Sequence, residues 1–144
     1  MKVTSMKVSG FRAVALGTIL AGGLIFNPLA HAAEKAVTQV QIPATSEAIW
    51  RSIDKETAIL DTLIRTGKLE ELHHHAFAIR DLVAALPSRP GALPAKRIAK
   101  IKTYSKFVAT LAERLDAAGD TKDKPAAVSN LAKLKEVLKT IRAD

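Results

Sequence analysis

The chain has 144 residues, of which 48% are hydrophobic and 25% are charged, and its formal net charge is +8 at pH 7. It contains no cysteine, which excludes disulfides, thiolate metal sites, covalent CxxCH haem attachment and a thiol nucleophile. The length suits one small domain, which must be stabilised by an apolar core because no disulfide can support it.

The N-terminal segment, residues 1–32, has the three-part layout of a secretory signal peptide. A basic region opens the segment, an uncharged run follows over 13–26, and Ala30-His31-Ala32 offers the small residues that a signal peptidase recognises. The uncharged run is too short for an ordinary membrane span. We therefore expect export to the periplasm, removal of the leader and no membrane span in the processed chain. The alternative is an uncleaved N-terminal anchor.

Without the three basic residues of the leader, the processed chain keeps 19 Lys and Arg against 14 Asp and Glu, a net charge of +5. This mixed balance favours a soluble surface over nucleic-acid binding, and an exported protein rarely meets nucleic acid. We expect residues 33–44 to form a loose N-terminal arm and residues 45–144 to form a single domain.

Apolar residues recur at three- and four-residue spacing in four segments of that domain, a pattern typical of amphipathic helices. The first helix is predicted over 45–66, with Thr45 or Ser46 as its cap and Gly67 at its end. The second is predicted over 68–86, where the apolar stripe is the most regular in the chain, and a proline follows it.

The third and fourth helices are predicted over 94–118 and 124–142. Pro94 suits the first turn of the third helix, Gly119 is expected to close it, and Asp123 can cap the fourth. Short connections make consecutive helices antiparallel neighbours. The predicted fold class is therefore all-α, an antiparallel up-down-up-down four-helix bundle. The structural alternative is a pair of helical hairpins that forms a homodimer.

The predicted domain contains three histidines, and they are consecutive: His73, His74 and His75. We place them in the second turn of the second predicted helix. Neighbouring residues on a regular helix point about 100° apart, so the triplet does not form a three-histidine site within one chain. Glu70 precedes His73 by three positions and His74 by four, so it shares their face of the helix.

Asp61 completes the candidate metal site, because a turn at Gly67 sets it level with His73 across the first two helices. A site made of Asp61, Glu70 and His73 or His74 offers carboxylate oxygens and imidazole nitrogens, a set that suits Zn, Ni or Cu(II). The alternative is that the histidines are solvated and paired with nearby carboxylates. A di-iron site is not expected, because the other three helices contain no histidine.

Two charged positions lie near the predicted core. Glu56 interrupts the apolar stripe of the first helix, and Arg80 lies beside that of the second. An unpaired buried charge is costly, so we expect a Glu56–Arg80 or an Asp54–Arg80 pair. The alternative is a carboxylate that lines a binding cavity.

The start of the third predicted helix is basic, with five Lys or Arg residues between positions 96 and 106. They point around the helix rather than along one line. We interpret them as a solvated face, with a surface for an anionic partner as the alternative.

The segment HHHAFAIRDL at 73–82, together with KFVATLAERLD at 106–116, resembles a group of small bacterial periplasmic helical proteins whose genes often stand beside heavy-metal efflux systems. The resemblance implies a periplasmic, metal-linked role. The expected architecture is also similar to the soluble cytochrome b and cytochrome c-prime bundles. This chain lacks the CxxCH motif and has no methionine after the leader, so we do not expect it to bind haem.

The sequence thus leads to two hypotheses. The first is a non-catalytic periplasmic metal-binding accessory protein for copper, nickel or zinc handling or resistance, with a periplasmic protein or an efflux component as its partner. The second is a helical interaction or scaffold module without a metal. An enzyme is not expected, because no Gly-rich phosphate loop, GxSxG motif or nucleophile–base pair is visible.

Overall fold

The computed structural model describes residues 40–89 and 93–143 of the chain. The predicted leader at 1–32 and most of the predicted arm lie outside the described residues. Residues 40–45, which belong to that arm and to the cap of the first helix, contain no helix or strand.

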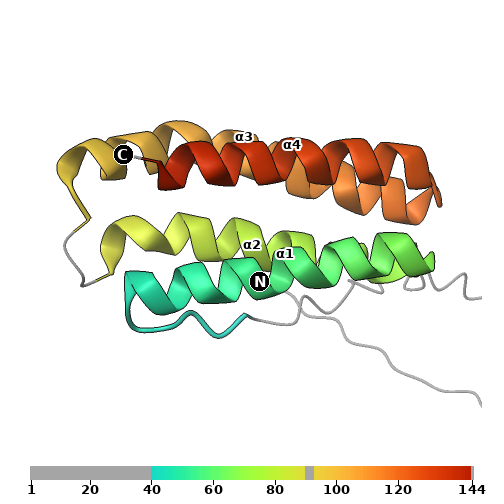
Figure 1. Ribbon diagram of the computed structural model, residues 1–144, viewed down its shortest axis with the longest axis horizontal. Helices are drawn as coiled ribbons and strands as arrows, with labels where there is room; N and C mark the ends of the chain where they lie inside the picture. The colour runs from blue at the N-terminus through green and yellow to red at the C-terminus, as the bar shows by residue number, and fades with distance from the viewer. Residues whose placement is uncertain (1–39, 90–92, 144) are drawn as a thin grey trace, which may run out of the picture. The chain divides into compact units, whose positions relative to one another are not determined.

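The described residues form four α-helices and no strand, so the predicted all-α class with four helices is confirmed. Two short 3-10 segments flank the second helix. In chain order the elements are α1 (Ser46–Thr66), η1 (Leu69–Glu71), α2 (Leu72–Ala85), η2 (Leu86–Ser88), α3 (Ala95–Asp120) and α4 (Lys124–Arg142). Figure 1 shows the helices alongside one another, with α1 next to α2 and α3 next to α4.

Local signals in the sequence set the ends of α1 and the start of α4. Thr45 Oγ1 accepts a hydrogen bond from the Ala48 backbone nitrogen at 3.2 Å, and Gly67 ends α1 in the left-handed conformation at φ 79°. Asp123 Oδ1 accepts from the Ala126 backbone nitrogen at 2.9 Å. The predicted bounds of the first and fourth helices are therefore correct to within one residue.

The second helix begins later than predicted. Residues 69–71 form η1, and the α-helix starts only at Leu72, so the histidines lie in the first turn of α2 and not in the second. Lys68, which precedes η1, has a non-helical conformation with ψ 63°. Four residues, Lys68 and the three of η1, therefore separate Gly67 from the start of α2.

Gly119 does not close the third helix, contrary to the prediction. α3 continues through it to Asp120, and the chain turns at Lys122, whose φ is 54°. A Cβ atom at Gly119 would lie 2.5 Å from the backbone oxygen of Leu69. The position requires glycine because η1 approaches the backbone of α3 too closely for any side chain.

All four helices bury one apolar face in a common core. The largest fully buried side chains are Ile49, Ile53, Leu60, Leu72, Ile79, Leu82, Val83, Leu86, Ile101, Leu115, Leu134 and Ile141. Burial of this apolar surface is the main term that stabilises the fold.

The helices do not contact one another equally. α2 packs closely against α1 and α3, and α3 against α4, whereas α1 and α4 meet at few positions. We call this last boundary the α1–α4 seam. Its charged residues are Asp54 and Asp61 on α1, and Lys135 and Arg142 on α4. In the part of the chain that the structure describes, no helix is long and apolar enough to cross a membrane.

Candidate functional site

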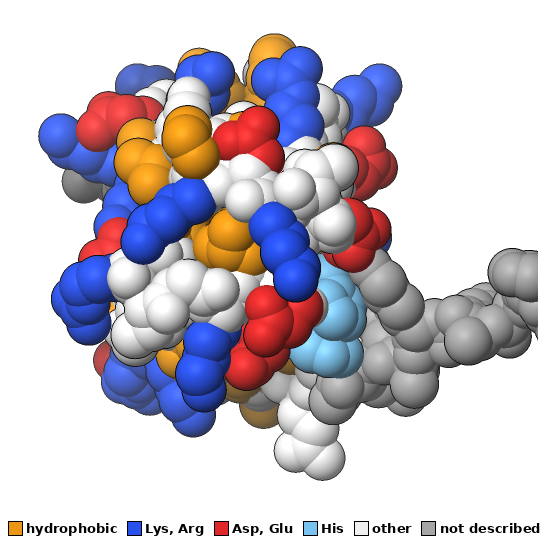
Figure 2. All heavy atoms as spheres, turned by 90° about the vertical axis from the view of Figure 1, so that its right-hand side faces the viewer, with side chains coloured by type: hydrophobic (Ala, Val, Ile, Leu, Met, Phe, Trp, Pro, Cys, Tyr) orange, Lys and Arg blue, Asp and Glu red, His pale blue; other side chains and the backbone are white. Residues whose placement is uncertain are grey.

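The histidines lie where η1 passes into α2, and Figure 2 shows histidine side chains beside acidic ones at this end of the helices. His73 Nδ1 lies 2.9 Å from the backbone oxygen of Glu70. The ring centroids of His73 and His74 are 3.7 Å apart. When a histidine donates its Nδ1 hydrogen to a carbonyl, its Nε2 carries the lone pair that binds a metal.

His75 is held by a carboxylate from the neighbouring helix. Its Nδ1 lies 2.6 Å from Glu56 Oε2 of α1, and the two side chains are only 24% and 20% exposed. A carboxylate on Nδ1 fixes both the orientation of the ring and its tautomer, and leaves Nε2 as the electron-pair donor. Metal-binding histidines are commonly oriented by a carboxylate in this way.

The expected Glu56–Arg80 pair is therefore wrong. Arg80 Nε donates to Asp81 Oδ1 at 2.8 Å, and its guanidinium carbon lies 4.6 Å from the ring centroid of Phe77. His75 and Arg80 are five residues apart, about 7.5 Å along the helix axis, so a single carboxylate of α1 meets only one of them. The carboxylate meets His75 because Glu56 faces the first turns of α2.

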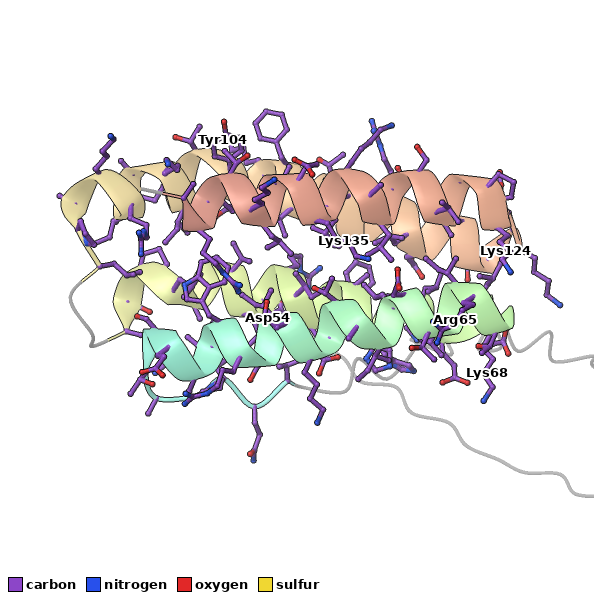
Figure 3. All side chains as sticks on the ribbon, viewed as in Figure 1. Asp54, Arg65, Lys68, Tyr104, Lys124 and Lys135 are labelled. Atoms are coloured by element: carbon purple, nitrogen blue, oxygen red, sulfur yellow. The ribbon has the colours of Figure 1, made fainter. Side chains whose placement is uncertain are left out.

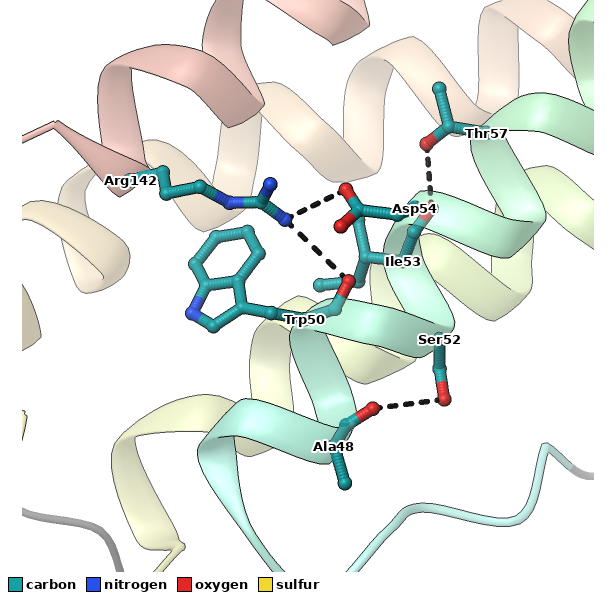
Figure 4. A network of polar contacts seen from close by, with 7 residues as sticks. All are labelled: Ala48, Trp50, Ser52, Ile53, Asp54, Thr57 and Arg142. Carbon is teal, nitrogen blue, oxygen red and sulfur yellow. Dashed lines mark hydrogen bonds and ion pairs between the residues drawn. The ribbon is translucent and has the colours of Figure 1, made fainter.

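The expected Asp54–Arg80 pair is wrong as well, because Asp54 pairs with the last turn of α4. Arg142 Nη2 donates to Asp54 Oδ1 at 2.8 Å and lies 3.5 Å from the Trp50 backbone oxygen. The same guanidinium lies 4.5 Å from the centroid of the Trp50 ring (Figure 4). Figure 4 shows Arg142 reaching from α4 toward Asp54 and the Trp50 backbone of α1.

A cavity of about 500 Å³ lies beside the His75–Glu56 pair. Side chains of α1 and α2 line it, together with two residues that precede α1. The lining residues are Val40, Gln41, Ser52, Lys55, Glu56, His74, His75, Ala78 and Leu82. Two imidazoles and one carboxylate thus border the same cavity.

Asp61, the predicted partner of His73, faces α4 instead. It accepts a hydrogen bond from Lys135 Nζ at 2.8 Å, and Figure 3 shows Lys135 on α4 reaching toward α1. The hydrogen bond and the charge of Lys135 lower the pKa of the Asp61 carboxyl from its ordinary value. The carboxylate that was expected to bind a metal is therefore paired with Lys135.

The structure thus brings only some of the predicted ligands together. His73 contacts Glu70 through a backbone atom, His74 borders the cavity with His75, and Asp61 belongs to the α1–α4 seam. Among residues 40–89 and 93–143, no group of three or more His, Asp or Glu side chains is arranged to hold a metal ion. The predicted set does not assemble around one point.

The sequence-based prediction missed the partnership of Glu56 with His75. Glu56 did stand out, because it interrupts an apolar stripe. What the sequence did not provide was the register of α1 against α2, which the three residues of η1 alter.

A scan against protein-family models, a search of curated proteins and a search of solved structures found no match for this chain. Its function has to be inferred from its own geometry.

Proposed function

We propose that this chain is a non-catalytic metal-binding accessory protein, exported to the periplasm, that takes Cu(II), Ni(II) or Zn(II) at the start of α2. The observation that carries the proposal is the His75–Glu56 contact at 2.6 Å, which prepares one imidazole for metal binding beside a cavity. The layout of residues 1–32 supports export, and the resemblance of 73–82 and 106–116 supports a role in heavy-metal handling or resistance.

In this proposal His75 binds the ion through Nε2, and His74, which borders the same cavity, is the second ligand. Glu56 is a positioning residue rather than a ligand. The remaining coordination positions are filled by water or by donors of a protein partner, such as an efflux component. An ion with few protein ligands exchanges readily, which suits a protein that passes metal on.

The arrangement of the four helices is also a proposal. We propose that the four helices form an antiparallel up-down-up-down bundle in the processed chain. The short connections between consecutive helices and the close packing of α2 with α1 and α3, and of α3 with α4, support this arrangement.

Isothermal titration calorimetry on tag-free protein tests the metal site. We expect about one ion per chain with a micromolar or tighter Kd for at least one of the three metals. His75→Ala should weaken binding about tenfold or more, and so should Glu56→Gln, because it removes the group that orients the imidazole. Asp61→Asn is the matched control, since it removes a carboxylate of α1 that faces α4, and it should leave the Kd unchanged.

Two results would contradict the metal site. The first is the absence of heat with all three metals. The second is an equal loss of affinity in Glu56→Gln and Asp61→Asn, which would indicate general electrostatic attraction. Circular dichroism of each variant checks that its helices are intact.

The second candidate function is an interaction module without a metal. One observation favours it: the Phe107 side chain of α3 is 57% exposed and lies against Tyr104, with 5.8 Å between the ring centroids. An exposed aromatic ring beside a half-buried one is suited to contact with a protein partner or a second copy of the chain. Light scattering at rising concentration tests self-association, and Phe107→Ser should abolish any that is found.

A further inference from the structure

Phe107 of α3 has no role in the proposed metal site, and yet it is one of two large hydrophobic side chains that are exposed among the described residues. It is 57% exposed, and the other, Val128 of α4, is 52% exposed. Phe107 lies against the half-buried Tyr104, with the two rings inclined at 45°. An aromatic side chain that projects from the surface is suited to the boundary between water and an apolar phase.

The part of α3 that carries these rings contains charges of one sign. Residues 95–112 include five Lys or Arg and no Asp or Glu. Residues 113–120, the remainder of the helix, include one Arg and three Asp or Glu. The exposed ring therefore lies in the cationic part of α3, and a cationic surface attracts anionic surfaces.

Helical spacing places several of these charges on the same face as Phe107. Positions 96, 100, 103, 107, 110 and 114 follow one another at intervals of three or four residues, so their side chains form one row along α3. The row reads Lys, Lys, Thr, Phe, Thr, Arg, and five of its six side chains are exposed. The aromatic ring thus has cations on both sides of it along the row, and the exposed Lys106 lies next to it in the chain.

The neighbouring helix is cationic as well. α4, which packs closely against α3, carries five Lys or Arg and one Glu. Lys135 and Arg142 pair with carboxylates of α1, and the other three cations of α4 are lysines. The surface that α3 and α4 form is therefore positive on balance, which is the charge that complements a layer of anionic headgroups.

We propose that the row at 96–114, together with Tyr104 and Lys106, is a membrane face that docks on an anionic lipid bilayer. The Phe107 ring enters the headgroup region, and the surrounding ammonium and guanidinium groups lie near lipid phosphates. The contact is peripheral, since no described helix is long and apolar enough to cross a membrane. A lipid surface fits this face better than a protein partner does, because the core of a protein interface is depleted of lysine. The membrane face does not depend on the metal site, whose residues belong to α1 and α2.

Co-sedimentation of the tag-free protein with vesicles tests the membrane face. One set of vesicles contains equal parts of phosphatidylglycerol and phosphatidylcholine, and the other contains phosphatidylcholine alone. We expect the first set to retain the protein, the second to leave it in solution, and added salt to reduce the retention. Phe107→Ser should weaken partitioning about tenfold. Lys96→Gln with Lys106→Gln should weaken it about tenfold or more.

Two matched controls distinguish the membrane face from the general properties of the chain. Val128→Ser removes the other exposed large hydrophobic side chain. Lys68→Gln with Lys122→Gln removes the same charge from exposed positions outside α3. Each control should change partitioning less than about twofold, and circular dichroism checks that the helices of every variant are intact.

Two results of this experiment would overturn the proposal. The first is equal weakening by the two double lysine variants, because attraction would then follow the net charge of the chain alone. The second is the absence of retention by the anionic vesicles. If those vesicles retain nothing while Phe107→Ser abolishes self-association in light scattering, the aromatic pair belongs to a contact between protein chains.

A second measurement tests whether the ring at position 107 enters the bilayer. Phe107→Trp and Val128→Trp each add one tryptophan to Trp50, the single tryptophan of the chain. Lipids brominated in their acyl chains quench the emission of an indole ring that reaches them. We expect these lipids, mixed into the anionic vesicles, to quench the added emission of Phe107→Trp and to spare that of Val128→Trp. Equal quenching of the two variants, or quenching of neither, would overturn the proposed orientation of α3 on the bilayer.

Discussion

Two boundaries between helices in this fold are built in opposite ways. Where α3 meets η1, the backbones approach so closely that a Cβ on Gly119 would lie 2.5 Å from the Leu69 oxygen. Along the α1–α4 seam, the helices are joined by Lys135–Asp61 and Arg142–Asp54 ion pairs, each 2.8 Å long, whose side chains are 44–60% exposed. The first boundary is stabilised by packing and the second by solvated charges, and exposed ion pairs stabilise proteins weakly.

The largest effect should come from the packed boundary. Gly119→Ala forces α3 and η1 apart, and overpacking of this kind costs roughly 2–3 kcal/mol in the free energy of unfolding. The matched control is Gly67→Ala, at which a Cβ meets nothing within 4 Å and the cost, about 1 kcal/mol, comes only from the positive φ. Urea unfolding followed by circular dichroism measures both. Equal costs would mean that η1 moves away without resistance.

The same boundary shows what the sequence could and could not predict. Helix caps act through residues close together in the chain, which is why the sequence predicts Gly67 and Asp123 correctly and includes Thr45 as one of two candidate caps of the first helix. The role of Gly119 depends on Leu69, fifty positions away in the chain, and no local pattern contains that information. The sequence-based prediction gave Gly119 the more common role of a glycine near a helix end, which is to end the helix.

The candidate site, too, could be predicted from the sequence only in part. That the histidines cluster at one end of a helix follows from the sequence alone. Their partners do not, because His75–Glu56 and Asp61–Lys135 link residues 19 and 74 positions apart. A heptad pattern shows which face of a helix is buried, but the level at which two helices meet depends on the whole connection between them.

At the α1–α4 seam a moderate effect is expected from Arg142→Met, which keeps much of the side-chain volume and removes the charge. It loses the ion pair with Asp54 and the contact with the Trp50 ring, together about 1 kcal/mol. The chain has one tryptophan, so the fluorescence of Trp50 reports this contact directly. We expect the emission of the folded protein to change in Arg142→Met.

Asp54→Asn is the matched control for that variant, because it breaks the same ion pair and leaves the guanidinium over the Trp50 ring. It should cost less than Arg142→Met and leave the emission near that of the unmodified protein. If the two variants change emission and stability alike, the ion pair rather than the ring contact holds Arg142 in place.

The smallest effect concerns the pH dependence of the Asp61–Lys135 pair. Because Lys135 lowers the pKa of Asp61 in the folded chain, folding is favoured at a pH above the ordinary carboxyl pKa near 4, where the carboxylate is charged in both states. This contribution is lost as the pH falls through the lowered pKa, since the carboxyl is then protonated in the folded chain too. For so exposed a pair it amounts to a few tenths of a kcal/mol, at most about 1 kcal/mol.

Comparison with Asp61→Asn isolates this contribution, because every other carboxylate titrates in both proteins and cancels in the difference. The unmodified protein should be the more stable of the two at neutral pH, and the difference in the free energy of unfolding should shrink toward zero as the pH falls through the lowered pKa of Asp61. High salt should reduce the difference at neutral pH, since an exposed pair is screened. A difference that stays constant with pH would instead assign the role of Asp61 to its shape and hydrogen bonding, and the α1–α4 seam would then not be a boundary of solvated charges.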